Sequence, residues 1–195
     1  MKLNLDRLDA TPSHHAFEAT AAWWAERVAE ADEGPYEVVA PFRFELDAHK
    51  MGEDVYLAGA MSGALELECG RCVARYRQAL RESFRLVLEP ARGRVPLDPE
   101  GDLALRRDGM CLGDEVESGW YRGSEIQLDT WFAEIIALAM PVQPLCDEAC
   151  KGLCPVCGAD RNAGDCGCVV REDRPRSPFA MLGALKGASD PNRGE

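Results

Sequence analysis

Nine cysteines, six of them between residues 146 and 168, constrain this 195-residue chain more than any other feature. Within that segment Cys154 and Cys157 form a Cys-Pro-x-Cys-Gly motif. Two thiolates at this spacing can bind one tetrahedral zinc ion if the backbone turns tightly between them. The proline presets the turn, and the glycine lets the next amides approach the sulfurs. The sequence therefore predicts that the segment Cys146–Cys168 binds zinc through its thiolates.

A second Cys-x-x-Cys pair, Cys69 and Cys72, lies far from this segment in the sequence. With Cys111 set aside, eight thiols remain, which is enough for two sets of four. One grouping joins the 69/72 pair to the 154/157 pair and leaves the other four cysteines as a second set. The alternative is one local site made from four of the six C-terminal cysteines, with the 69/72 pair free. Spacing does not choose between them, so the predicted zinc ligands are Cys146, Cys150, Cys154, Cys157, Cys166, Cys168, Cys69 and Cys72.

The chain shows no apolar stretch of the roughly 18 residues that a membrane span requires. The N-terminus also has no apolar signal core, so we expect a cytoplasmic protein without membrane association. Thiols stay reduced in that compartment, and metal binding explains the cysteines better than disulfides do. A thiol oxidoreductase that uses Cys69 and Cys72 is a less favoured alternative, because no thioredoxin-like βαβ pattern surrounds them.

The sequence gives no reason to expect an enzyme. A zinc ion with four thiolates is closed to water and substrate. We find no phosphate-binding glycine loop, no nucleophile elbow and no credible Ser/His/Asp set. We therefore expect neither catalysis nor a small-molecule substrate.

Hydrophobic periodicity predicts an α+β domain over residues 1–141, with an antiparallel β-sheet packed by helices. The expected elements are a short strand in 1–10, a helix in 16–31, three long strands, an irregular acidic connection over 90–123, a strand at 124–128 and a helix at 131–140. A two-residue turn at 70–71 would place Leu65 opposite Tyr76 and Cys69 opposite Cys72. A cysteine-rich zinc module (142–170) follows, and residues 171–195 are expected to form a short helix (177–186) and a disordered tail.

The formal net charge is −12, with 34 acidic residues against 22 basic ones. This balance suits a basic partner and disfavours nucleic acid, unless positive charge is locally concentrated. Such a concentration occurs along one strand face, which could contact RNA phosphates or simply pair with neighbouring glutamates in solvent; the second interpretation is slightly favoured. The candidate RNA-binding residues are Arg75, Arg77, Arg81 and Arg85.

Four motifs in order resemble the YceD family of large ribosomal RNA subunit accumulation proteins. Residues 65–72 resemble its L-E-C-x-R-C signature, and residues 134–142 its E-x-I-x-L-x-x-P helix end. Residues 150–158 match C-K-G-L-C-P-x-C-G, and residues 177–186 resemble the closing P-F-A-x-L-x-x-L helix. No motif matches residues 90–123.

This resemblance implies a bacterial, non-enzymatic factor in ribosome biogenesis that promotes accumulation of large-subunit ribosomal RNA. The implied partners are a ribosomal protein or a large-subunit assembly intermediate, and ribosomal RNA itself if the arginines bind it. A zinc-stabilised protein-interaction module unrelated to ribosomes is the alternative.

Overall fold

The computed structural model describes residues 1–31, 36–113 and 117–168. The predicted helix at 177–186 and the tail lie outside the described residues. The chain divides into two compact units, Met1–Cys150 and the segment from Lys151 onward, and each is described by itself. In chain order the elements are β1 (Lys2–Asn4), a 3₁₀ turn (Leu5–Arg7), β2 (Ser13–Ala19), α1 (Ala21–Ala31), β3 (Glu37–Met51), β4 (Asp54–Glu68), β5 (Arg75–Pro90), α2 (Pro99–Arg107), β6 (Met110–Leu112), β7 (Ser118–Tyr121), β8 (Glu125–Gln127) and α3 (Asp129–Ala139).

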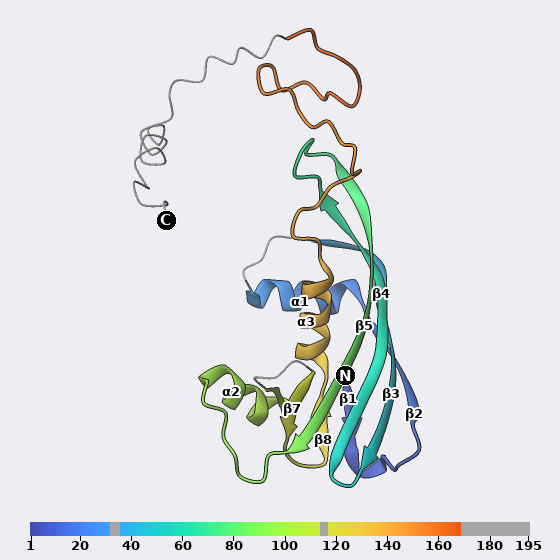
Figure 1. Cartoon of the computed structure of the whole chain (residues 1–195), viewed down its shortest axis with the longest axis vertical. Coiled ribbons are helices and arrows are strands. Elements are labelled where there is room, and N and C mark those ends of the chain that lie inside the picture. Colours follow the sequence, from blue (N-terminus) through green and yellow to red (C-terminus); the bar gives the residue numbers. More distant parts are fainter. Residues whose placement is uncertain (32–35, 114–116, 169–195) are drawn as a thin grey trace, which may run out of the picture. The chain divides into compact units, whose positions relative to one another are not determined.

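The first unit is built on a six-stranded sheet in the order β2-β3-β4-β5-β7-β6 (Figure 1). Its pairings are antiparallel except that of β5 with β7, which is parallel. A two-stranded sheet of β1 and β8 accompanies it. The prediction of an α+β fold with a mostly antiparallel sheet is confirmed. No helix in the described part of the chain is long and apolar enough to cross a membrane.

The three long strands bury alternate side chains, as their period-two pattern predicts. Odd positions of β4, such as Leu57 and Leu65, and even positions of β5, such as Leu80 and Leu86, face the core. Helices α1 and α3 cover this inner face (Figure 1). The opposite face of these strands carries their exposed polar side chains.

The predicted β4–β5 register is wrong by two residues. Leu65 lies opposite Gln78, and Tyr76 lies opposite Leu67. The turn is wider than two residues, because the Cys69 and Ala74 backbones pair across it and the Val73 amide donates to the Cys69 carbonyl. Val73 takes a left-handed φ of 61° to close this turn. Since a shift of two keeps every side chain on its own face, the predicted burial still holds.

The predicted helix at 16–31 is correct only from Ala21 onward. Residues Ser13–Ala19 form β2, which pairs along β3 and places Phe17 opposite Phe44. Local alanine and glutamate content favours a helix, but the alternation that points Phe17 inward matches the sheet. Tertiary pairing therefore overrides helix propensity at this edge.

The segment predicted as an irregular connection over 90–123 contains α2, β6 and β7. Helix α2 begins with two standard signals: the Asp98 side chain accepts the Gly101 amide, and Pro99 occupies the first turn. Strands β6 and β7 extend the sheet beyond β5. The strands are only three and four residues long, which is why no periodicity reveals them.

Aromatic side chains dominate the core between α3 and the sheet. The Phe132 and Phe44 rings stack with centroids 3.9 Å apart and planes within 8°. Both residues are fully buried. The α3 helix matches the predicted helix at 131–140 closely, and it begins at Asp129 without a side-chain cap. Its last turn leads into residues 141–150, which contain Cys146 and Cys150.

Candidate metal centres

The first candidate centre consists of Cys69, Cys72, Cys146 and Cys150, whose sulfurs all lie within 4.8 Å of one another. The Cys69 and Cys150 sulfurs are 3.8 Å apart, and the Cys72 and Cys146 sulfurs are 3.6 Å apart. A tetrahedral site with zinc–sulfur bonds of 2.3 Å requires sulfurs about 3.8 Å apart. The spacing therefore fits a four-thiolate metal site, and the four residues could hold an ion.

Hydrogen bonds join the two halves of this centre. Two residues come from the β4–β5 hairpin tip and two from the chain that follows α3. The Gly70 amide donates to the Pro144 carbonyl at 2.8 Å. The Arg71 guanidinium donates to the carbonyl oxygens of Glu148 and Cys150. The hairpin tip is thus joined to residues 144–150 by hydrogen bonds in addition to the thiols.

Burial shields this first centre. Cys69, Cys72 and Cys150 are buried, and the side chains of Tyr76 and Leu145 pack against them. A cluster of four thiols, three of them buried, is unfavourable when several of them ionise together, because like charges repel at low dielectric. A divalent cation removes that repulsion, so the setting suits a metal.

The pKa values of two thiols in this centre are shifted in opposite directions. Backbone N–H groups of Cys146 and Cys72 point at the Cys69 sulfur and lower its pKa to about 6. Hydrogen bonding with the Cys72 sulfur, together with burial, raises the pKa of Cys146 to about 12. One thiolate is therefore ready to receive a cation, while another ionises only when a cation is bound.

The second candidate centre lies in the unit that begins at Lys151. Its members are Cys154, Cys157, Cys166 and Cys168, with sulfurs again within 4.8 Å of one another. The knuckle closes through two backbone bonds: Gly158 donates to Cys154, and Cys154 donates to Ala159. Gly158 takes φ 74°, which favours glycine at this position. The motif therefore folds as its spacing predicts.

Polar side chains support the loop around the second centre. The Asn162 side chain accepts the Lys151 amide at 2.8 Å, and the Asp160 carboxylate accepts the Asn162 amide at 2.9 Å. Backbone N–H groups of Cys157 and Val156 lower the pKa of Cys154 to about 6, whereas bonding with the Cys157 sulfur raises that of Cys168 to about 12. Cys157 and Cys166 are exposed, so this centre is more open than the first.

The first grouping considered from the sequence does not match the structure, and the second matches in part, because four of the six C-terminal cysteines do form a local group. The 69/72 pair joins Cys146 and Cys150, not the 154/157 pair, and it is not free. Cys69 and Cys72 also do not oppose each other as a cross-strand pair, because Cys69 pairs with Ala74 and Cys72 lies within the turn. Cys111 lies outside both groups, buried against Ala91 and Leu105. Sequence spacing could not pair residues that meet only through the packing of α3.

The four candidate arginines share the exposed face of β5. Arg75 pairs with Glu66 at 3.0 Å, and Arg85 pairs with Glu117 at 3.3 Å. These two fit the interpretation of a solvated face with glutamate partners. Arg77 and Arg81 have no ion pair within the described residues. The structure thus separates the four into two paired and two unpaired cations.

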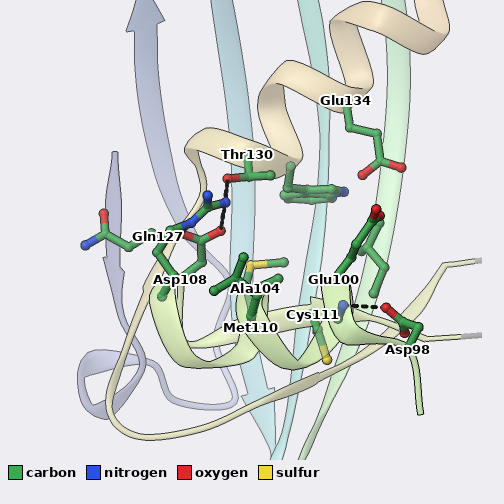
Figure 2. Close-up of a pocket in the computed structure, with 14 residues that line it drawn as sticks. Asp98, Glu100, Ala104, Asp108, Met110, Cys111, Gln127, Thr130 and Glu134 are labelled. Carbon is green, nitrogen blue, oxygen red and sulfur yellow. Dashed lines mark hydrogen bonds and ion pairs between the residues drawn. The ribbon is translucent and has the colours of Figure 1, made fainter. Parts of the chain in front are cut away.

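One feature was not indicated by the sequence. A cavity of about 410 Å³ lies between α2, β6 and α3 (Figure 2). Ten of its fourteen lining residues come from the segment predicted to be irregular. The Asp98-Pro99 capping signal could have revealed α2, but nothing local reveals that α2 packs beside α3.

Comparison with known proteins gives distant relatives. A chloroplastic homolog 1 of large ribosomal RNA subunit accumulation protein YCED from Arabidopsis thaliana is 23% identical over 204 residues, covering 95% of this chain and 59% of that protein. The Zea mays homolog of the same description is 24% identical, covering 71% of this chain and 52% of that protein. An uncharacterized Mycobacterium tuberculosis protein is 28% identical, covering 58% of this chain and 48% of that protein. The chain spans about half the length of the curated relatives it matches.

No solved structure matches the chain. The family model described as large ribosomal RNA subunit accumulation protein YceD matches residues 57–186. That range covers more than half of the chain and includes most of β4, all of β5 and α3, and both cysteine groups. The chain therefore belongs to the YceD family.

Proposed function

We propose that this protein is a non-enzymatic ribosome-biogenesis factor that promotes accumulation of large-subunit ribosomal RNA and carries two structural zinc ions. Membership of the YceD family supports the ribosomal part, together with the names of the two plant relatives. In this proposal the protein acts in the bacterial cytoplasm. Its net charge of −12 favours a basic ribosomal protein or an assembly intermediate as the direct partner.

The sulfur spacing carries the zinc part of the proposal. Separations of 3.6 and 3.8 Å in the first centre match the edge of a tetrahedral zinc–thiolate site. Zinc bound there supplies a cross-link, not a reactive centre, since four thiolates leave no open position. Cys69 and Cys72 would hold it from the hairpin, and Cys146 and Cys150 from the chain after α3.

The second zinc, held by the four cysteines of residues 154–168, organises the smaller unit. That unit has few buried apolar side chains among its described residues, so metal binding would supply its folding free energy. We accordingly propose that the zinc module begins at Lys151 and not at residue 142. Cys146 and Cys150 then belong to the sheet unit.

The test of the ribosomal role is co-purification of the tagged full chain at moderate salt from its own host. We expect large-subunit proteins or precursor particles to accompany it. A deletion strain should show fewer large subunits in ribosome profiles, restored by the plasmid-borne gene. Normal profiles together with non-ribosomal partners would instead support the zinc-stabilised interaction module.

The thiol-oxidoreductase alternative makes a different prediction. It requires Cys69 and Cys72 to be free for exchange, whereas zinc binding engages both. Stoichiometric zinc with no disulfide-reductase activity in the purified protein would exclude it.

A further inference from the structure

The cavity between α2, β6 and α3 has apolar walls and an acidic mouth. Leu103, Met110, Leu112 and Trp131 contribute much of the apolar lining. Its volume of about 410 Å³ lies within the usual size range of binding pockets. Leu103 and Leu112 are 59% and 40% exposed, so the apolar surface continues outward at the rim. The pocket can therefore hold the apolar part of a side chain, while the exposed leucines contact the polypeptide that carries it.

Two carboxylates at this cavity have no cation of their own. Glu100 from α2 and Glu134 from α3 approach the same side of the pocket (Figure 2). Neither makes an ion pair or hydrogen bond with any residue in the described ranges. Glu134 is exposed, and partial desolvation beside the pocket raises the pKa of its carboxyl. The other two acids that line the pocket already have partners: Asp98 accepts the Gly101 amide, and Asp108 pairs with Arg107.

The nearby arginines do not neutralise these glutamates. Arg107 donates to both Asp108 oxygens at 2.9 Å and to the Thr130 hydroxyl at 2.8 Å. Arg106 pairs with Asp102 at 2.7 Å on the same helix. Both cations near the pocket are held elsewhere, and its mouth therefore remains negative.

We propose that this pocket binds a lysine or arginine side chain presented by a basic polypeptide segment. An apolar stem that ends in a cation matches apolar walls beneath an acidic mouth. The Trp131 ring in the lining adds a face for cation–π attraction. The exposed leucines at the rim favour a peptide over a free small cation. That the polypeptide is a ribosomal protein rests on the proposed function, whereas the preference for a basic segment does not.

Calorimetry with a hexa-arginine peptide at about 150 mM salt tests the pocket on the full zinc-loaded chain. The double variant Glu100→Gln/Glu134→Gln should weaken binding about tenfold. Glu37→Gln/Glu82→Gln removes the same charge from two exposed glutamates outside the pocket, and it should weaken binding less than about twofold. Equal weakening in both would mean non-specific attraction to an acidic protein and would overturn the proposal.

The binding position needs its own readout. In NMR spectra of the labelled protein, the Trp131 indole N–H should shift on peptide addition. Leu103→Arg, which adds a cation at the exposed rim, should also weaken binding. An unshifted Trp131 signal, or equally tight binding of a neutral leucine-rich peptide, would refute the site. Peptide binding without ribosomal co-purification would contradict the proposed function but support the proposed pocket.

Discussion

The Cys69 sulfur lies 3.8 Å from the Cys150 sulfur, although 81 residues separate the two in the chain. This contact joins the tip of the β4–β5 hairpin to the segment that follows α3. A zinc ion at this position would connect the sheet to the end of the helix that packs against it. The two cysteine groups therefore have different structural consequences, and these can be measured separately.

Metal analysis should find two zinc ions per chain. Cys150→Ser should remove one, and Cys166→Ser should remove the other, because no cysteine belongs to both groups. Cys111→Ser, outside both groups, should keep two. Plasma emission spectrometry of the purified variants gives the stoichiometry. Loss of both ions in either single variant would show that the groups are not independent.

The first centre should contribute to the stability of the sheet unit. Cys69→Ser leaves the hairpin tip without its metal connection, so the melting temperature of the sheet should fall by at least about 4 °C. Near-ultraviolet circular dichroism follows the core tryptophans during this transition. Cys166→Ser is the matched control, because its group lies in the other unit, and it should leave that transition unchanged.

Zinc should be released on acidification. Protons compete with the metal for thiolates, so affinity falls as pH decreases. Above a pH of about 6 the lowered pKa keeps Cys69 ionised, and below that value it too takes up a proton. The decline in affinity should therefore become steeper below about pH 6. A chromogenic chelator titration across pH 5 to 8 measures this, and pH-independent retention would contradict thiolate binding.

The Phe132–Phe44 stack should be essential to the fold. Phe132→Ala deletes a fully buried ring and should lower the free energy of unfolding by about 3–5 kcal/mol. Leu138→Ala, on the same helix but 77% exposed, should cost well under about 1 kcal/mol. Urea denaturation of both variants gives the comparison. Similar losses would mean that α3 does not pack as described.

Any RNA binding should depend on the unpaired arginines of β5. Arg77→Glu/Arg81→Glu should weaken binding to large-subunit ribosomal RNA by about tenfold or more, because two phosphate partners become repulsive. Arg43 and Arg106 already pair with Glu18 and Asp102, so changing those two to glutamate is the matched control. Filter binding at two salt concentrations reports both. Undiminished binding after joint change of all four β5 arginines would exclude this face.

Much of the fold could be predicted from the sequence because its long elements have strong periodicity. The inward faces of β4 and β5, and the helix that contains Phe132, follow directly from the spacing of apolar residues. The short strands expected in 1–10 and at 124–128 are also present, as β1 and β8, but three other strands were not predicted in this way. Strands β6 and β7 acquire their structure from pairing with β5, and β2 from pairing with β3.

The sequence by itself determined that Cys154 and Cys157 lie in a tight knuckle that could hold a metal ion, since proline and glycine shape that turn locally. It also determined which side chains of the long strands face the core. Only the tertiary structure decided that Cys69 and Cys72 join Cys146 and Cys150. That choice depends on where the packing of α3 directs the chain after residue 140, and on a hairpin turn two residues wider than alternation alone suggests. Both are long-range contacts, and residue spacing carries no information about them.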